Sequence, residues 1–329
     1  MNARENALRI IRFDHPECVM VEPPIHHIYY HGCNHHGFGD DHAHDSPVGA
    51  RWFDIWGTGW HKIHEGVMGL PKIYPLADTS NLNTYQWPDP DDERICGAIY
   101  QTAAQQLAED RFLTGHHRDT LWEKAYMLVG MENLMVYFYT EPAFARDVLH
   151  GIMDFQMGVA EHYLNAGVDF VKLSDDLGIQ NAPLLNPRTV NEFLVPEYRR
   201  LFNLYKRYGV LIDFHSCGHI EPFIDMFIEL GVDILNPLQA TANDLSRIRH
   251  RTQRRMALRG GISSAIVMNG PVERIDAEVH HRIWQLGQEG GYFCGPDQSL
   301  PYPQAHLNAL YEAIERHGSY PLIPPDPEQ

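Results

Sequence analysis

A histidine and a cysteine stand two positions apart in the segment DFHSCGH, residues 213–219, which continues the apolar run from Val210 to Ile212. On an extended strand end, side chains two positions apart point the same way, so those of His215 and Cys217 could converge on one ion. Zinc prefers imidazole and thiolate ligands, and catalytic zinc takes three protein ligands and keeps one position open. The pair therefore predicts two zinc ligands, against the alternative of a buried cysteine beside a hydrogen-bonded histidine.

The third ligand of such a site has two candidates. Cys294 comes first, because it is the other cysteine that follows the end of a predicted strand. Asp297, three residues later, comes second, since a carboxylate oxygen also binds zinc. Both choices stay open at the level of the sequence.

The same segment also fits a cobalt-binding pattern. Asp213, His215 and Gly218 spell D-x-H-x-x-G, the loop with which some corrinoid-binding domains ligate cobalt through histidine. That loop is normally followed by Ser-x-Leu and by Gly-Gly. Here the segment from Ser263 to Ala265 lacks the leucine, although a Gly-Gly pair follows at 290–291. Zinc is therefore the preferred metal.

The elements that would position these residues follow an alternating pattern. Short β-rich runs alternate with stretches of helical period, notably from Phe144 to Tyr163 and from Val272 to Leu286, as in parallel strands joined by crossover helices. A length of 329 residues suits one such domain, residues 1–329. We therefore expect an α/β fold, a (β/α)8 TIM barrel with N-terminal loop insertions, whose strands cover 18–22, 52–56, 111–114, 169–174, 210–215, 233–235, 256–260 and 292–295.

Polar residues recur where these predicted strands end. In a TIM barrel the catalytic groups sit at the carboxyl ends of the strands, because the loops that follow converge there. Aspartate, histidine and cysteine at one end of many strands indicate a shared site, although adjacent aspartates also serve as helix caps. The residues concerned are Asp54, His116, His117, Asp175, Asp176, His215, Cys217, Asn236, Gln239, Ser263, Cys294 and Asp297.

Two segments near the N-terminus interrupt the repeat. Residues 26–47, HHIYYHGCNHHGFGDDHAHDSP, contain seven histidines and no sustained period, which predicts a long loop after the first strand. This loop could hold a second metal, shape the mouth of the pocket, or be a solvated loop that binds metal only adventitiously. Residues 60–93 are rich in Pro, Asp and Asn and predict a further excursion on the same rim.

The composition excludes several classes of partner. A formal charge of -17 argues against nucleic acid and against an anionic membrane surface. Five scattered cysteines, in a chain without a secretory signal or a long apolar span, favour reduced thiols in a cytoplasmic protein. The 21 histidines make metal chemistry a reasonable expectation.

The chain resembles the uroporphyrinogen decarboxylase superfamily, and within it the branch of zinc-dependent, corrinoid-linked methyltransferases and O-demethylase-like proteins. The resemblance rests on the order and spacing of motifs that span most of the chain. These motifs are FDIWG, YPLADTSNLNTYQWPDP from Tyr74, TLWEKAYMLVGMEN from Thr120, GVDFVKLSDDLGIQ from Gly167, FHSCGHI from Phe214, GVDILNPLQ from Gly231, RGGISS from Arg259 and GGYFCGPDQSLP from Gly290.

The resemblance implies a (β/α)8 barrel that holds zinc with a His-x-Cys pair and a later cysteine. His215 and Cys217 match that pair, whereas Cys294 precedes Pro296 and does not match the family position directly. The methyl group would pass between a small-molecule donor or acceptor and a corrinoid on a separate protein. Members of this superfamily often form homodimers.

The resemblance also bears on the reaction. Porphyrin decarboxylation is disfavoured, because residues 22–45 contain no Arg or Lys to bind a polycarboxylate. With a thiol or a methyl ether as substrate, zinc would act as a Lewis acid; for a methyl ether, Asp176 or Glu123 would transfer protons or orient groups. Asp54, in FDIWG, is a third candidate catalytic residue. The alternatives are a metal-dependent lyase or hydrolase that needs no corrinoid, and a protein that only binds a corrinoid or a metal.

Overall fold

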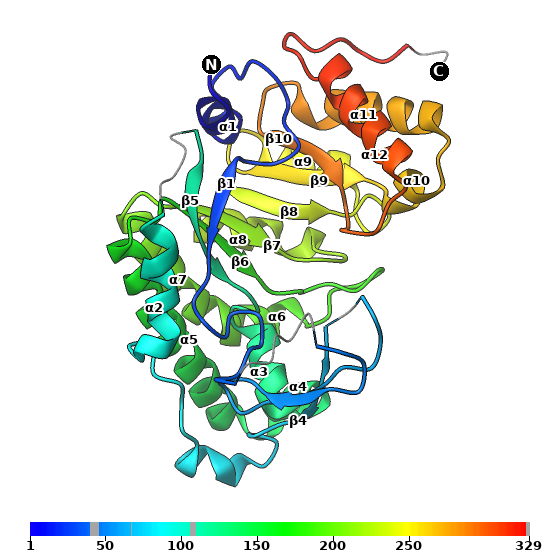
Figure 1. The fold of residues 1–329 in the computed structure, drawn as a ribbon. Helices are drawn as coiled ribbons and strands as arrows, with labels where there is room; N and C mark the ends of the chain where they lie inside the picture. The colour runs from blue at the N-terminus through cyan, green and yellow to red at the C-terminus, as the bar shows by residue number, and fades with distance from the viewer. Residues whose placement is uncertain (40–45, 67, 106–109, 327–329) are drawn as a thin grey trace.

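A curled sheet of parallel strands forms the centre of the protein (Figure 1). The computed structural model describes residues 1–39, 46–66, 68–105 and 110–326. Within these ranges the sheet has seven strands in the order β1-β5-β6-β7-β8-β9-β10. Their bounds are Ile25–Ile28 (β1), Phe112–His117 (β5), Phe170–Ser174 (β6), Leu211–His215 (β7), Ile234–Leu238 (β8), Ala257–Ile262 (β9) and Tyr292–Pro296 (β10).

The seam between the first and last strands is closed by the chain that precedes β1. Met20 forms a parallel bridge with Phe293 of β10, and the backbone N–H of Cys294 donates to the Met20 carbonyl oxygen at 2.8 Å. The predicted first strand, 18–22, therefore contributes only this bridge to β10. The strand that pairs with β5 is β1, which follows it in the chain. The expected fold class, an α/β barrel of the TIM type, is confirmed.

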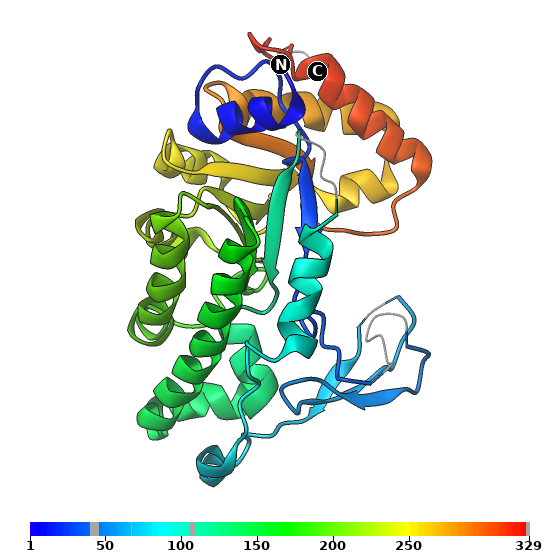
Figure 2. The ribbon, with the colours of Figure 1, turned by 60° about the vertical axis from the view of Figure 1, so that its left-hand side comes forward.

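One predicted barrel strand is wrong. Residues 52–56 do not join the barrel, because β2 (Arg51–Phe53) pairs antiparallel with β3 (Gly59–His61), which pairs with β4 (Leu70–Ile73). Buried Trp52 stacks on Trp60 across these strands, with ring centroids 6.2 Å apart. Figure 2 shows this small sheet projecting from the barrel. The predicted loop and excursion between residues 26 and 93 therefore contain strands.

Helices cover the outside of the sheet (Figure 1). The predicted apolar face from Phe144 to Tyr163 is buried along α5, and the later one along α11. None of the helices in the described ranges combines the length and apolarity that crossing a lipid bilayer requires. The helices are α1 (Ala3–Arg12), α2 (Glu93–Ala103), α3 (Trp122–Val129), α4 (Met131–Thr140), α5 (Pro142–Asn165), α6 (Pro187–Thr189), α7 (Val195–Arg207), α8 (Ile224–Leu230), α9 (Leu245–Thr252), α10 (Ser264–Asn269), α11 (Val272–Gly287) and α12 (Gln304–His317), with short helices η1 (Thr79–Thr84), η2 (Val190–Leu194) and η3 (Glu221–Phe223).

An apolar layer closes the amino end of the barrel. One buried cluster takes a side chain from each of β1, β5, β6, β8, β9 and β10 and adds the apolar face of α1. The backbone N–H of Gly291 donates to the Ile10 carbonyl oxygen at 2.9 Å, which fixes α1 against this end. We call this layer the barrel floor; its strand residues are Ile25, Phe112, Phe170, Ile234, Ala257 and Phe293, with Leu211 packed against them.

Candidate metal site

Polar side chains form a ring directly above the barrel floor. Because side chains alternate along a strand, the residue two positions beyond each floor residue points into the barrel as well. These polar side chains line a cavity of about 290 Å³, which reaches His215 on its carboxyl side. On β6 to β9 the ring consists of Lys172, Asp213, Asn236 and Arg259, two residues after Phe170, Leu211, Ile234 and Ala257.

Three candidate metal ligands converge at the carboxyl end of β6 and β7. One ligand atom each from Asp176, His215 and Cys217 lies within 4.8 Å of the other two. His215 Nε2 is 3.3 Å from Cys217 Sγ and 3.6 Å from Asp176 Oδ1. Asp176 Oδ1 also accepts a hydrogen bond from the Cys217 backbone N–H at 2.8 Å, which fixes the turn after β7. The predicted pair therefore does converge, and the third member is Asp176.

Asn236 orients the imidazole of His215. Asn236 Oδ1 lies 3.0 Å from His215 Nδ1, while Asn236 Nδ2 donates to Asp213 Oδ1 and, at 3.3 Å, to the Phe214 carbonyl oxygen. Because the amide nitrogen must donate to these acceptors, its oxygen faces His215 and accepts the Nδ1 proton. Burial lowers the pKa of His215 and favours the neutral ring. The Nε2 lone pair is thus left free for a metal.

The thiol of Cys217 is protonated in the protein without a metal. Burial, followed by the negative charge of Asp176, raises its pKa to about 12. Gln298, in the loop after β10, donates from Nε2 to Cys217 Sγ at 3.5 Å. A thiolate would form here only with a compensating cation, and a bound zinc ion supplies that charge.

The prediction of Cys294 as the third ligand is wrong in this structure. Cys294 is fully buried in β10, next to Phe293 of the barrel floor, so its side chain points to the opposite face of the sheet. There its thiol faces Glu278 and Arg282 of α11 and a neighbouring side chain of its own strand, Tyr292. Burial raises the pKa of this thiol to about 12. Cys294 belongs to the packing between strand and helix.

The second choice, Asp297, caps a helix. It is buried just after β10, and its Oδ1 accepts hydrogen bonds from the backbone N–H of Ser264, at 3.0 Å, and from the Ser264 hydroxyl. Ser264 begins α10, so the carboxylate satisfies the free donors at that helix N-terminus. Among the described residues Asp297 is outside the group of candidate metal ligands. The next residue, Gln298, is the one that reaches Cys217.

Asp54 has a structural role in the small sheet. Its Oδ1 accepts hydrogen bonds from the backbone N–H groups of Trp56 and Thr58, both at 2.9 Å, and its Oδ2 accepts one from Trp60 Nε1 at 2.9 Å. These bonds form the turn from β2 to β3. The prediction that Asp54 is catalytic is therefore not supported, because its two oxygens are used within this buried turn.

Glu123 and Asp175 add two more carboxyl groups beside Asp176. Asp175 is buried and accepts hydrogen bonds from the backbone N–H groups of Leu121 and Glu123, both at 2.8 Å, and from Tyr198 Oη at 2.7 Å. Burial raises the pKa of Asp175 to about 7. Burial and the charges of three neighbouring aspartates, 119, 175 and 176, raise the pKa of Glu123 well above its usual value. This shift favours the protonated form of the Glu123 carboxyl.

Of the histidines in segment 26–47 that the structure describes, two lie in strand β1 and the others follow it in the chain. His26 and His27 lie within β1, not in a loop, and His27 Nδ1 is 2.5 Å from His116 Nε2. His35 is buried, stacks on Trp60 and pairs with Asp119. Among the described residues no group of three candidate ligands forms here. His42, His44 and the Asp40-Asp41 pair lie outside the described residues.

Sequence reasoning missed three cations and an amide. Lys172, Arg259 and Arg118 line the cavity, and Gln298 contacts Cys217. The signal for the first two was present in the sequence. Each is a charged residue in the middle of an otherwise apolar strand, FVKLS in β6 and ALRGGI in β9, which indicates a polar barrel interior.

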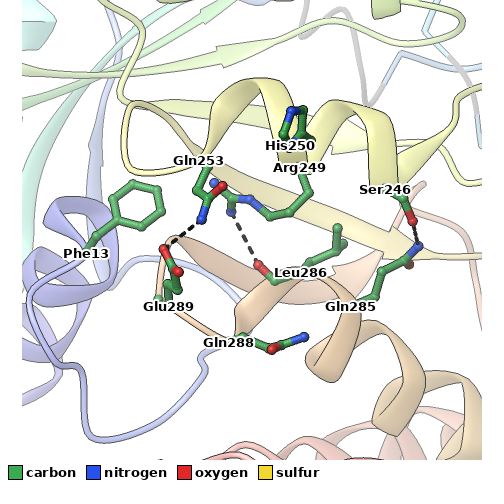
Figure 3. A pocket seen from close by; sticks show the side chains of 10 residues that line it. Phe13, Ser246, Arg249, His250, Gln253, Gln285, Leu286, Gln288 and Glu289 are labelled. Carbon is green, nitrogen blue, oxygen red and sulfur yellow. Dashed lines mark hydrogen bonds between the residues drawn. The ribbon is translucent and has the colours of Figure 1, made fainter.

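A second cavity, of about 270 Å³, lies at the opposite end of the barrel, beside Phe13 and between α9 and α11 (Figure 3). Its half-buried cation, Arg249, donates to the carbonyl oxygens of Leu286, Gly291 and Met256 at 3.0 to 3.4 Å. This cavity contains none of the candidate metal ligands. The chemistry therefore belongs to the carboxyl end of the barrel.

His117, which lines the cavity, makes the stability of the protein depend on pH. Its Nδ1 is 2.6 Å from Gln156 Oε1, its Nε2 contacts Tyr205 Oη, and burial lowers its pKa from 6.5 to about 4. As the pH falls from 6.5, the unfolded chain binds a proton that the folded protein excludes until about pH 4. This histidine should therefore lower the free energy of unfolding by about 3 kcal/mol over that range.

Urea unfolding at several pH values tests this prediction. Wild type is expected to lose stability more steeply between pH 6.5 and 4 than His117→Gln does. His64→Gln, at an exposed position, should follow wild type. Equal slopes in wild type and His117→Gln would show that the buried imidazole titrates normally.

Comparison with known proteins agrees with the fold. A solved methyltransferase from Methanosarcina mazei superposes with a TM-score of 0.72 and 15% identity, over 96% of this chain and 99% of that chain. A D-psicose 3-epimerase from Clostridium cellulolyticum H10 gives a TM-score of 0.39 and 11% identity, over 72% of this chain and 85% of that chain, which is too weak to carry an argument. Among curated proteins, no sequence matches this chain. The model of the uroporphyrinogen decarboxylase (URO-D) family matches residues 63–317, well over half of the chain, which therefore belongs to that family.

Proposed function

We propose that the protein is a zinc-dependent methyltransferase. It would move a methyl group between a small methyl ether or thiol and a corrinoid cofactor carried by a partner protein. The observation that carries this proposal is the convergence of Asp176, His215 and Cys217 at the mouth of the barrel cavity. The fold shared with a methyltransferase and the family membership support the same reading.

The three side chains suit zinc by their chemistry. They offer a carboxylate oxygen, an imidazole nitrogen and a sulfur, the ligand types that zinc takes in catalytic sites, where three protein ligands leave one position for substrate. His215 already presents its Nε2 lone pair, because Asn236 occupies Nδ1. Asp176 thus changes from a predicted proton carrier to a proposed ligand. When bound, zinc would act as a Lewis acid toward the ether oxygen or the thiol sulfur.

Glu123 is the proposed proton donor for ether cleavage. Its raised pKa favours the protonated carboxyl, and Tyr126 Oη donates to Oε1 at 3.0 Å. When the C–O bond of a methyl ether breaks, the methyl group passes to the corrinoid and the oxygen keeps the electron pair. Glu123 would give that oxygen its proton, so that the demethylated product leaves as a neutral alcohol or phenol. With a thiol substrate, no leaving oxygen needs this proton.

A methyl-transfer assay tests the proposed function. Zinc-loaded protein is mixed with reduced cobalamin, as a stand-in for the corrinoid partner, and with simple aryl methyl ethers; in the reverse direction, methylcobalamin is mixed with small thiols. We expect methylcobalamin to form or disappear, followed by visible absorbance, at a rate that depends on zinc. Asp176→Ala should lose the zinc-dependent rate. Substrate turnover at the same rate without any corrinoid would instead support a lyase or hydrolase.

A further inference from the structure

We propose that the barrel cavity binds its substrate through a carboxylate group, held at Lys172 with support from Arg118. The reacting end of the substrate would then lie at the candidate metal ligands. This inference rests on the proposed function, because it assigns the class of small molecule that the same site would take.

The charge of the cavity is opposite to that of the whole protein. Among its lining residues, Arg118, Lys172 and Arg259 are cationic and Asp213 is anionic, which leaves an excess of two positive charges with the histidines neutral. The complete chain has a formal charge of -17. Between the low-dielectric walls of a cavity these charges attract an anion more strongly than the same charges do on an exposed surface.

The three cations differ in how far the protein already neutralises them. Arg259 donates to Asp213 Oδ2 at 3.1 Å and to Glu22 Oε2 at 3.3 Å. Arg118 donates to the neutral Asn34 Oδ1 at 3.2 Å. In the part of the chain that the structure describes, the ammonium group of Lys172 has no hydrogen bond or ion pair. Lys172 and Arg118 are therefore the two lining cations without an ion pair among the described residues, and Lys172 also has no hydrogen bond.

A half-buried ammonium group without a bonded partner is expected to lower the stability of the folded protein. Burial lowers the pKa of Lys172, and the charge of Arg259 lowers it further, whereas Asp213 and Glu22 raise it. A methionine at the same position would pack its apolar stem equally well without the charge. A charged residue whose ammonium group makes no hydrogen bond or ion pair in a cavity is typical of a binding site, where stability is given up for function.

The position of Lys172 on β6 sets the distance between the bound carboxylate and the reacting end of the substrate. On β6, Lys172 lies opposite Asp213 of β7, and Ser174, two residues on, lies opposite His215. Two residues of strand correspond to about 7 Å. A carboxylate at Lys172 and a methyl-bearing atom at His215 would therefore belong to a small molecule of about the length of a substituted benzoate. The cavity of about 290 Å³ is large enough for one such ring.

Binding of benzoate and of benzamide tests this inference. The two probes have nearly the same shape and differ in charge, and neither carries a methyl group, so their binding is independent of methyl transfer. Calorimetric titration of the full chain should show tighter binding of benzoate, by about ten- to hundredfold. Lys172→Met should remove this preference and leave the weak benzamide binding unchanged. Lys172→Arg should keep the preference, because it keeps the charge.

Thermal unfolding and a matched variant complete the test. Benzoate should raise the Tm of wild type but not of Lys172→Met, whose own Tm should equal or exceed that of wild type. Lys72→Met, on the small sheet and outside the cavity, makes the same change in net charge and should behave as wild type. These measurements need no zinc, so failure of the zinc-dependent assay leaves them valid.

Three outcomes would overturn the inference. The first is equal affinity of wild type for benzoate and benzamide, including no measurable binding of either. The second is a preference for benzoate that survives Lys172→Met, which would place the anion elsewhere. The third is inorganic phosphate that binds as tightly as benzoate with the same dependence on Lys172, which would indicate a phosphate group in place of a carboxylate.

Discussion

Replacing Cys217 with serine is expected to reduce the zinc content of the purified protein from about one ion per chain to none. A serine hydroxyl is a poor zinc ligand at neutral pH, and the two remaining candidate ligands, Asp176 and His215, are too few for a tight site. Elemental analysis after dialysis measures this directly. The zinc-dependent methyl-transfer rate should disappear in parallel.

Cys294→Ser is the matched control for this experiment. The same chemical change is made at the other candidate cysteine, whose thiol points away from the cavity and toward α11. Its full zinc content is expected to remain, while burial of a hydroxyl in this packed position should cost about 1 to 3 kcal/mol of stability. Zinc retained in Cys217→Ser but lost in Cys294→Ser would reverse the assignment. Zinc retained in both would remove the metal site.

Glu123→Gln is expected to slow the cleavage of methyl ethers by a factor of about 100 to 10,000, as is usual when a positioned proton donor is lost. Glutamine preserves the shape of the side chain and can still accept the hydrogen bond from Tyr126. It cannot, however, give a proton to the leaving oxygen. Zinc content should stay at the wild-type level, because Glu123 is outside the ligand group.

Varying the phenol that leaves from the ether gives a more specific test of the role of Glu123 than the rate with one ether. Ethers of acidic phenols need little protonation as they leave, so the effect of Glu123→Gln should shrink steadily as the pKa of the phenol falls. Glu132→Gln, at an exposed position on α4, is the matched control and should have wild-type rates. An equal loss of rate for all ethers would mean that Glu123 only shapes the site.

Regular periodicity made much of the fold predictable. The apolar faces of α5 and α11 and the strands β6, β7 and β10 lie within a few residues of where the pattern predicts them. The prediction of a barrel strand at residues 52–56 was wrong for a physical reason. The largely apolar run WFDIW at 52–56 fits a barrel strand that is buried on both faces as well as a strand of a small antiparallel sheet, and the exposure of Phe53 is known only from the structure. Only the hydrogen-bond partners distinguish the two.

The same limit explains the error at Cys294. In β10 the residues Tyr292, Phe293 and Cys294 are all apolar and all buried, because a parallel barrel strand is covered on both faces. The sequence therefore does not tell which of them faces the interior, and a shift by one residue moves the thiol from one side of the wall to the other. His215 and Cys217 were predictable because both are polar and two positions apart. Asp176 required the geometry of the turn.

The barrel floor has a consequence for the order of events. Because α1 and the apolar layer close the amino end, a molecule reaches the cavity from the carboxyl end of the barrel, where His215 lies. A large second reactant, such as a corrinoid-bearing protein, would cover that end when it approaches. The small molecule would then have to be loaded first and released last, and the kinetics would follow a compulsory sequence.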